Sequence, residues 1–164
     1  MRTLIAALTC LVFATAFAED LHGEIKGKPY IIDGNTIKIE HQRIRIHGID
    51  APEAQQRCTD QRGQWDCGLE AANALKFFLA GNWITCIEKD RDLYGRIVAV
   101  CYVGEVGRPD VGETMVVEGW AVAYRRFSIA YLDEEDVARN KGRGLWRGDF
   151  IVPWEWRRGK RLNF

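Results

Sequence analysis

The chain has 164 residues, of which 47% are hydrophobic and 28% charged, and its formal net charge is zero. The balanced charge argues against a polycationic coat for nucleic acid, and the length suffices for one domain with a substantial core. The sequence contains no internal repeat, low-complexity tract or linker, so we expect a single folded unit.

The N-terminus has the pattern of a secretory signal peptide. Arg2 provides the positive charge, an apolar run follows, and Ala16-Phe17-Ala18 is a small-x-small cleavage site. The apolar run is too short for a membrane span, and Glu19-Asp20 follows it at once. We therefore expect residues 1–18 to be removed, leaving residues 19–164 as a secreted or periplasmic domain with no membrane attachment.

Apolar and polar residues alternate in five runs that predict β-strands. The first strand ends at Ile31-Ile32, and Asp33-Gly34 is typical of a tight hairpin turn. The second strand is expected over residues 36–40 and the third over 43–49. The fourth and fifth are expected within residues 83–90 and 97–104.

Three segments have the 3.6-residue periodicity or the charge pattern of helices. The first covers residues 67–80 and ends at Gly81, and the second covers 110–118 and ends at Gly119. The third covers 131–140, with acidic residues early and basic residues late, as the helix dipole favours. Five strands with helices between and after them predict an α+β fold built on a five-stranded OB-type barrel with three helices.

Four cysteines remain after the expected cleavage, an even number for an oxidising compartment. A hairpin centred on the loop near Tyr94 would place Cys86 opposite Cys101. That pairing leaves Cys58 with Cys67, closing a short polar loop. A zinc site is disfavoured because the spacings are not those of a Cys-x-x-Cys pair and no histidine is near.

Two clusters of carboxylates and arginines, residues 31–53 and 90–96, suit phosphodiester hydrolysis. Oxygen ligands such as those of Asp50 suit a hard divalent cation, which polarises a phosphoryl group. A carboxylate such as Glu53 can activate water, and arginines neutralise the charge of the transition state. The combination is more informative than any of its residues alone, since an exposed arginine or an Asp-x-Pro-Glu turn is common.

The C-terminal stretch 141–164 has an excess of five positive charges, with Trp146, Trp154 and Trp156 among its basic residues. It could form a stacking and phosphate-contact surface, or the tryptophans could close the core beneath a solvated basic tail; we favour core closure for the tryptophans. Trp65 has the same two interpretations. The three histidines, none in a ligand-like pair, are assigned to surface or supporting roles.

The segments DGNT, RIRIHGIDAPE, DLYGR, EGWAVAYRR and RNKGRGLW, in this order and spacing, resemble the staphylococcal nuclease (thermonuclease) family over about residues 23–156. The resemblance implies a five-stranded OB barrel with three helices. It also implies calcium-dependent hydrolysis of DNA and RNA that leaves 3′-phosphate ends, by a protein that is a monomer.

The resemblance assigns roles to individual residues. Asp50 matches a metal-ligating aspartate, and Thr36 matches the residue whose backbone carbonyl contributes to the metal site. Glu53 matches the general base, and Arg45 and Arg96 match the two arginines that hold the scissile phosphate.

Weaker assignments concern substrate contacts. Asp92 and Tyr94 match positions beside the substrate pocket. Tyr124, Arg125 and Arg126, with Phe127, could extend a nucleic-acid groove by stacking and charge, although Tyr124 and Phe127 could equally close the core.

One position departs from the family pattern: Asn35 stands where the family has a second metal-ligating aspartate. An amide oxygen can still ligate Ca²⁺, but the site loses one negative charge, and ligand charge tunes affinity. The leading hypothesis is a secreted, metal-dependent endonuclease with little base specificity. The alternative is an OB-fold binding module that has lost turnover, and a disulfide-stabilised structural domain ranks last.

Overall fold

The computed structural model describes residues 23–107 and 109–163. The expected signal peptide and its cleavage site lie outside these residues. Within the described part, no helix is long and apolar enough to cross a membrane.

The main β-sheet has six strands in the order β1-β8-β9-β4-β3-β2. Their bounds are β1 Glu24–Gly27, β2 Pro29–Asp33, β3 Thr36–Ile39, β4 Gln42–Ile46, β8 Ile84–Arg91 and β9 Ile97–Val103. The last five correspond to the five expected strands, and β1 adds a sixth because it pairs with the edge of β8. All neighbours are antiparallel except β4 and β9, which run parallel.

The sheet curls strongly but does not close as the expected barrel would. Among the described residues, the edge strands β1 and β2 are not hydrogen-bonded to each other. The curl nevertheless brings β1 against β3, where a side chain at Gly27 would clash with Ile39. The sheet is therefore a curled half-barrel in an α+β fold.

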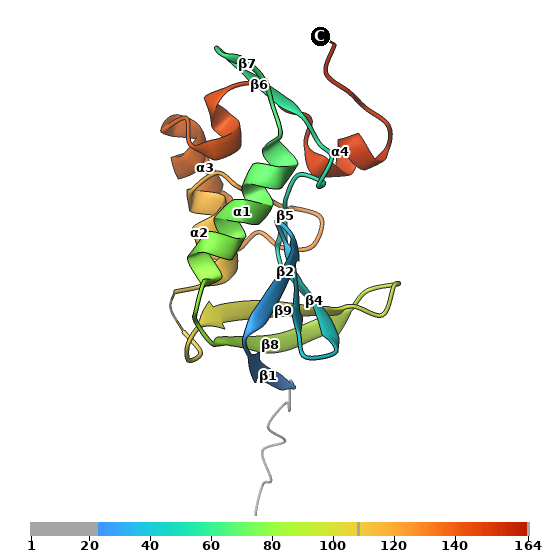
Figure 1. Cartoon of the computed structure of the whole chain (residues 1–164), viewed down its shortest axis with the longest axis vertical. Coiled ribbons are helices and arrows are strands. Elements are labelled where there is room, and N and C mark those ends of the chain that lie inside the picture. The colour runs from blue at the N-terminus through green and yellow to red at the C-terminus, as the bar shows by residue number, and fades with distance from the viewer. Residues whose placement is uncertain (1–22, 108, 164) are drawn as a thin grey trace, which may run out of the picture.

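The three expected helices are present, each within one residue of its predicted bounds at either end: α1 Cys67–Leu79, α2 Val111–Val117 and α3 Leu132–Asn140. Asp110 begins α2 by accepting a hydrogen bond from the Glu113 N–H (3.1 Å). Figure 1 shows these helices together beyond one end of the curled sheet. The expectation of only three helices is wrong, because a 3₁₀ helix (Gly144–Arg147) and α4 (Pro153–Arg157) follow them.

Other short elements were also not predicted. Two-residue strands β5 (Ile49–Asp50) and β10 (Val122–Ala123) pair with each other, and β6 (Cys58–Asp60) pairs with β7 (Gly63–Trp65). The hairpin turn is Gly34-Asn35 rather than Asp33-Gly34, since β2 includes Asp33. This one-residue difference places Asn35 at the turn itself.

The main core lies between the concave side of the sheet and the helices. Ile37, Ile44 and Ile46 are fully or almost fully buried there, together with Leu75 and Leu79 of α1. Burying a side chain of this size contributes about 1.5–3 kcal/mol. The alternation in β3 and β4 therefore fixes which face of these strands is left for polar residues, Arg45 among them.

A second, smaller core joins the C-terminal region to the rest of the molecule. Its buried residues are Cys58, Cys67, Val122 and Leu145, and Trp65, Trp146, Phe150 and Trp154 pack against it. This packing confirms the preferred interpretation for Trp146 and resolves Trp65 in the same way, whereas Trp154 packs against this core and also lines a cavity.

Both expected disulfides are present. Cys86 and Cys101 are direct partners in the β8–β9 register and are bonded, and Cys58 is bonded to Cys67. The second bridge links β6 to the first residue of α1, so it holds the start of this helix beside the segment that follows β5.

Candidate active site

Asp50 is the centre of the candidate site, and it is fully buried at the end of β5. Its Oδ1 accepts a hydrogen bond from Arg45 Nη2 of β4 at 2.8 Å. A buried carboxylate needs such a partner, because burial of an unpaired charge is costly. The structure thus brings together a metal ligand and a phosphate-binding arginine predicted from the sequence.

Glu53, the predicted general base, lies in the loop just after β5, and its side chain is 36% exposed. This loop packs closely on the first turn of α1, where a side chain at Gly68 would clash with the Glu53 carbonyl oxygen. Gln56 also holds the loop, since its Oε1 accepts from the Glu53 N–H at 3.3 Å. The carboxylate is therefore partly exposed on a well-anchored backbone.

Arg157 of α4 joins the two carboxylates. Its Nη2 donates to Asp50 Oδ2 at 2.7 Å, and its Nη1 donates to Glu53 Oε1 at 2.6 Å and to Asp50 Oδ1 at 3.2 Å. Burial lowers the pKa of the Arg157 guanidinium, but its hydrogen bonds and the charges of both carboxylates outweigh burial, so the pKa lies above its ordinary value. The group is a permanent cation between the two acids.

Asn35 reaches the same centre from the β2–β3 turn. With its amide nitrogen toward Asp50, it would donate to Oδ1 at 3.3 Å. With the amide turned over, its nitrogen donates to Asp33 Oδ1 at 3.0 Å and its oxygen accepts from the Ala51 N–H at 3.1 Å. We assign the second orientation, because it makes more and shorter hydrogen bonds.

This orientation turns the Asn35 amide oxygen toward Asp50 Oδ1. Close packing holds the turn in place, since a side chain at Gly34 would clash with Ala51 and crowd Ala71. Asp33 is engaged by Asn35 through both the amide and the backbone N–H (2.9 Å), so it supports the turn and does not replace the missing aspartate.

Arg96 lies in the β8–β9 loop on the same face of the sheet as Arg45. The parallel register pairs Arg45 with Val98, and Arg96 shares the parity of Val98. Its Nε donates to Asp92 Oδ2 at 2.7 Å, and its guanidinium lies 5.7 Å from the ring centroid of Tyr94. Arg96 is therefore positioned by Asp92 and Tyr94 of its own loop.

The pKa of Asp92 is below its ordinary value. Burial raises this pKa, but the hydrogen bonds from the Arg96 side chain and from the backbone N–H groups of Arg96 and Tyr94 outweigh burial. Tyr94 itself is 86% exposed. The three residues form a compact, charged loop whose aromatic tip faces solvent.

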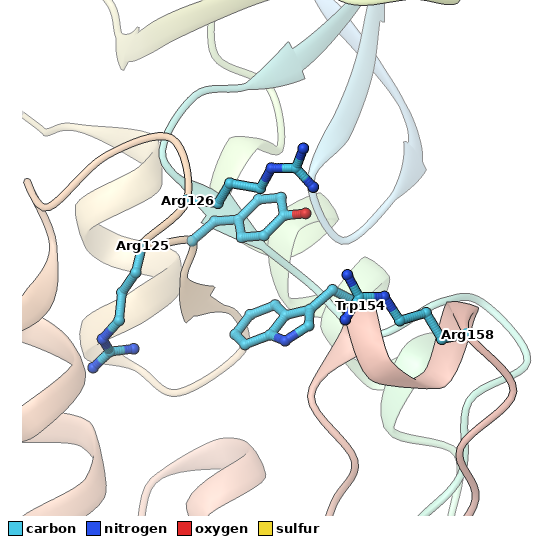
Figure 2. Close-up of a pocket in the computed structure, with 5 residues that line it drawn as sticks. Arg125, Arg126, Trp154 and Arg158 are labelled. Atoms are coloured by element: carbon cyan, nitrogen blue, oxygen red, sulfur yellow. The ribbon is translucent and has the colours of Figure 1, made fainter.

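An aromatic and cationic cavity of about 250 Å³ adjoins the site, lined by Tyr124, Arg125, Arg126, Trp154 and Arg158. The Tyr124 ring stacks on Trp154 at 5.3 Å and lies 6.0 Å from the Arg45 guanidinium. Figure 2 shows Arg126 and Arg158 beside this cavity, whereas the Arg125 side chain turns away from Trp154. Arg125 instead pairs with the buried Glu135 at 2.9 Å.

The predicted substrate residues Tyr124 and Arg125 therefore have different surroundings. Tyr124 lies beside Arg45, but the guanidinium of Arg125 is engaged in a structural ion pair on α3. Thr36 is fully buried in β3 next to Asn35, and metal ligation by its carbonyl stays a prediction. The sequence pattern, in contrast, does not predict a role for Arg157 at the site. The only signal is its place in the basic C-terminal stretch.

The donor set at Asp50 suits a hard divalent cation. The donor atoms are oxygens, which hard divalent cations prefer. The Arg157 guanidinium between Asp50 and Glu53 shows that these carboxylates attract a positive group. In the described part of the chain, no three His, Cys, Asp or Glu side chains gather to hold a metal. Asp50 and the Asn35 oxygen would therefore leave most of the coordination sphere to other ligands.

The chain matches the family model described as "Staphylococcal nuclease homologue" over residues 43–148. It is 35% identical over 151 residues to the succinoglycan biosynthesis protein ExoI of Rhizobium meliloti, covering 89% of this chain and 76% of that protein. It is 32% identical to an uncharacterized endonuclease of Escherichia coli, covering 98% and 100%, and 36% identical to Protein ParB of Escherichia coli, covering 93% and 88%. The chain therefore belongs to the staphylococcal nuclease homologue family.

Proposed function

We propose that the protein is an endonuclease that hydrolyses phosphodiester bonds of DNA and RNA and requires a divalent cation, Ca²⁺ being the first candidate. The carrying observation is the meeting of buried Asp50, Arg45 and the accessible carboxylate of Glu53 at one point of the fold. Membership of the family and the endonuclease named among the similar proteins support the same reaction.

The site residues divide the chemistry between them. Arg45 and Arg96, on one face of the sheet, would bind the scissile phosphate and neutralise the charge that develops on its oxygens. Glu53 would take a proton from the attacking water as its oxygen bonds to phosphorus. Breaking the bond to the 5′ oxygen, which takes up a proton, leaves a 3′-phosphate.

Asp50 and Asn35 would hold the cation. When bound, it would polarise the phosphoryl group and add positive charge at the transition state. The loss of one ligand charge at Asn35 favours a weaker site than two aspartates would make. We expect weak base specificity, because Arg45, Arg96 and the cation would contact phosphate and not base edges.

The aromatic and cationic cavity gives the substrate a path away from the site. Trp154 and Tyr124 offer a surface for base stacking, and Arg126 and Arg158 offer phosphate contacts at its rim. These residues extend the proposed substrate contacts beyond the β8–β9 loop, toward the C-terminal helix.

We also propose that the protein acts in the periplasm or outside the cell. The expected signal peptide and the two disulfides in the structure support an oxidising compartment.

The test is cleavage of single- and double-stranded DNA and of RNA by the oxidised protein with Ca²⁺, Mg²⁺ or Mn²⁺, and with chelator. We expect metal-dependent cleavage that Glu53→Gln slows by about 10²–10⁴-fold. Glu24→Gln, on the exposed edge strand β1, is the matched control and should cleave as the parent does. Product ends should block extension by a polymerase until a phosphatase treats them.

A binding module without turnover is the second candidate, favoured by Asn35 and by the guanidinium that covers both carboxylates. It predicts no cleavage by the parent with any metal, cleavage by Asn35→Asp, and retained binding of oligonucleotides. Metal-dependent cleavage by the parent would exclude it.

A further inference from the structure

Arg157 occupies the position between the two carboxylates on which the proposed chemistry depends. Both oxygens of Asp50 accept from it, at 2.7 and 3.2 Å, and Glu53 Oε1 accepts at 2.6 Å. The Arg157 side chain is only 36% exposed and Asp50 is fully buried. This is therefore not a solvated surface ion pair of the kind that contributes little.

The C-terminal helix that carries Arg157 is anchored on two sides. Trp154, in the first turn of α4, stacks on Tyr124 with an interplanar angle of 8°. Gln56 Nε2 donates to the Ile151 carbonyl at 2.5 Å, just before α4 begins, while Gln56 Oε1 holds the Glu53 N–H. The guanidinium is thus held at the site by packing as well as by charge.

A divalent cation and this guanidinium compete for the same atoms. Ca²⁺ binds carboxylate oxygens at about 2.3–2.6 Å, so a cation on Asp50 Oδ2 would lie against Arg157 Nη2, 2.7 Å from that oxygen. Two positive groups cannot occupy one position, and each neutralises the charge that attracts the other. Arg45, bonded only to Oδ1, leaves Oδ2 open once Arg157 withdraws.

We propose that Arg157 is an internal counter-cation that competes with the divalent cation for Asp50 and Glu53 and thereby sets the metal affinity of the site. The inference rests on the proposed metal dependence. In the metal-free protein Arg157 neutralises the buried carboxylate and covers the base, and metal binding displaces it. Metal affinity is then lower than the oxygen ligands alone would produce.

The experiment measures Ca²⁺ binding directly, by calorimetry on the oxidised, chelator-treated protein, and measures Tm with and without Ca²⁺. Arg157→Gln should bind Ca²⁺ about tenfold more tightly or better, within the range of coupling between two sites. It should also lower Tm in chelator, because Asp50 loses a partner, and enlarge the rise in Tm that Ca²⁺ causes. Arg157→Lys, which keeps the charge, should stay close to the parent affinity.

Lys160→Gln is the matched control, since Lys160 is an exposed cation three residues after Arg157 and lies outside the proposed substrate surface. It should leave both Ca²⁺ affinity and Tm as in the parent. Asp50→Asn introduced into Arg157→Gln should abolish binding, which assigns the measured cation to this position.

Equal or weaker Ca²⁺ binding by Arg157→Gln would overturn the inference, and would make Arg157 a phosphate-contact or structural residue. If cleavage by the parent still needs metal in that case, the proposed function stands and only the competition fails. Failure of the proposed function shows itself separately, as absence of cleavage with every metal.

Discussion

At the scale of single residues, each predicted phosphate-binding arginine is held by an acidic side chain. Arg45 is bonded to Asp50 and Arg96 to Asp92, both within 2.8 Å. A positioned guanidinium loses less conformational freedom when a phosphate binds, so these ion pairs preorganise the proposed phosphate site. Asp92 is the better subject for a test because it is not a predicted metal ligand.

Asp92→Asn keeps an oxygen for the backbone N–H groups and removes the charge that holds Arg96. We expect kcat/KM to fall about tenfold, because a misplaced guanidinium stabilises the transition state less well. Glu88→Gln, at the exposed Arg91 pair of the same hairpin, should leave kcat/KM unchanged. Unchanged cleavage by Asp92→Asn would show that Arg96 needs no such support.

The shifted pKa of Asp92 predicts that the stability of the protein depends on pH. Because the pKa of Asp92 in the folded protein lies below its ordinary value of 3.8, the contribution of Asp92 to stability is present above that value. This contribution is lost as the pH falls through the lower, folded-state pKa. The free energy of unfolding, measured with urea, should therefore fall between pH 6 and pH 3 in the parent. It should fall less in Asp92→Asn, which lacks the titrating carboxylate.

At the scale of elements, the site depends on close approaches between a helix and two connections. The first turn of α1 meets the Glu53 loop at Gly68, and the β2–β3 turn meets Ala51 and α1 at Gly34. The Glu53 backbone at Gly68, and the Ala51 methyl group at Gly34, stand where a side chain would lie, so each glycine allows an approach that a larger residue would block.

Gly68→Ala separates this packing effect from helix propensity. Propensity alone would stabilise α1 by up to about 1 kcal/mol. We expect instead a destabilisation of about 1–3 kcal/mol, since the clash is with the rigid backbone at Glu53, and a loss of kcat/KM of at least about tenfold. Denaturant midpoints and cleavage rates would measure both, with Asn73→Ala on the exposed face of α1 as the control. A stabilised, fully active Gly68→Ala would contradict the close approach.

At the scale of the whole molecule, the two disulfides have different relations to the site. Cys86–Cys101 joins paired positions within one hairpin, whereas Cys58–Cys67 joins the β6–β7 hairpin to the start of α1, next to the Glu53 loop. Replacing either pair by serine should cost about 2–4 kcal/mol of unfolding free energy, since both close short loops.

Activity should distinguish the two pairs. At a temperature where both variants are folded, the Cys86→Ser/Cys101→Ser protein should keep its kcat, and the Cys58→Ser/Cys67→Ser protein should lose part of its kcat because α1 no longer holds the Glu53 loop. Circular dichroism at the assay temperature would verify folding. Equal kcat values in both variants would show that Gly68 packing alone positions Glu53.

Features of the fold that depend on neighbouring residues were predictable from the sequence, and several of the remaining features were not. The alternation in β3 and β4, the bounds of α1 to within one residue and the opposition of Cys86 and Cys101 were predictable, because each pattern lies within one element or one hairpin. The two-residue strands β5 and β10 and the five-residue helix α4 were not, because elements this short have no measurable periodicity. The sixth strand, β1, was not predicted either, because it joins the sheet through its pairing with the distant strand β8.

The sequence by itself determined the family, through the order and spacing of its short segments. It also determined the paired cysteines and the cluster of Arg45, Asp50 and Glu53, because these residues lie close together along the chain. Only the tertiary structure decided that Arg157 lies between the two carboxylates, 107 residues from Asp50 and 104 from Glu53. It also decided that Arg125 pairs with the buried Glu135 of α3, ten residues further along the chain. The physical reason is that charge acts through space: which cation neutralises a buried acid depends on how the helices pack, and the order of residues alone does not specify that contact.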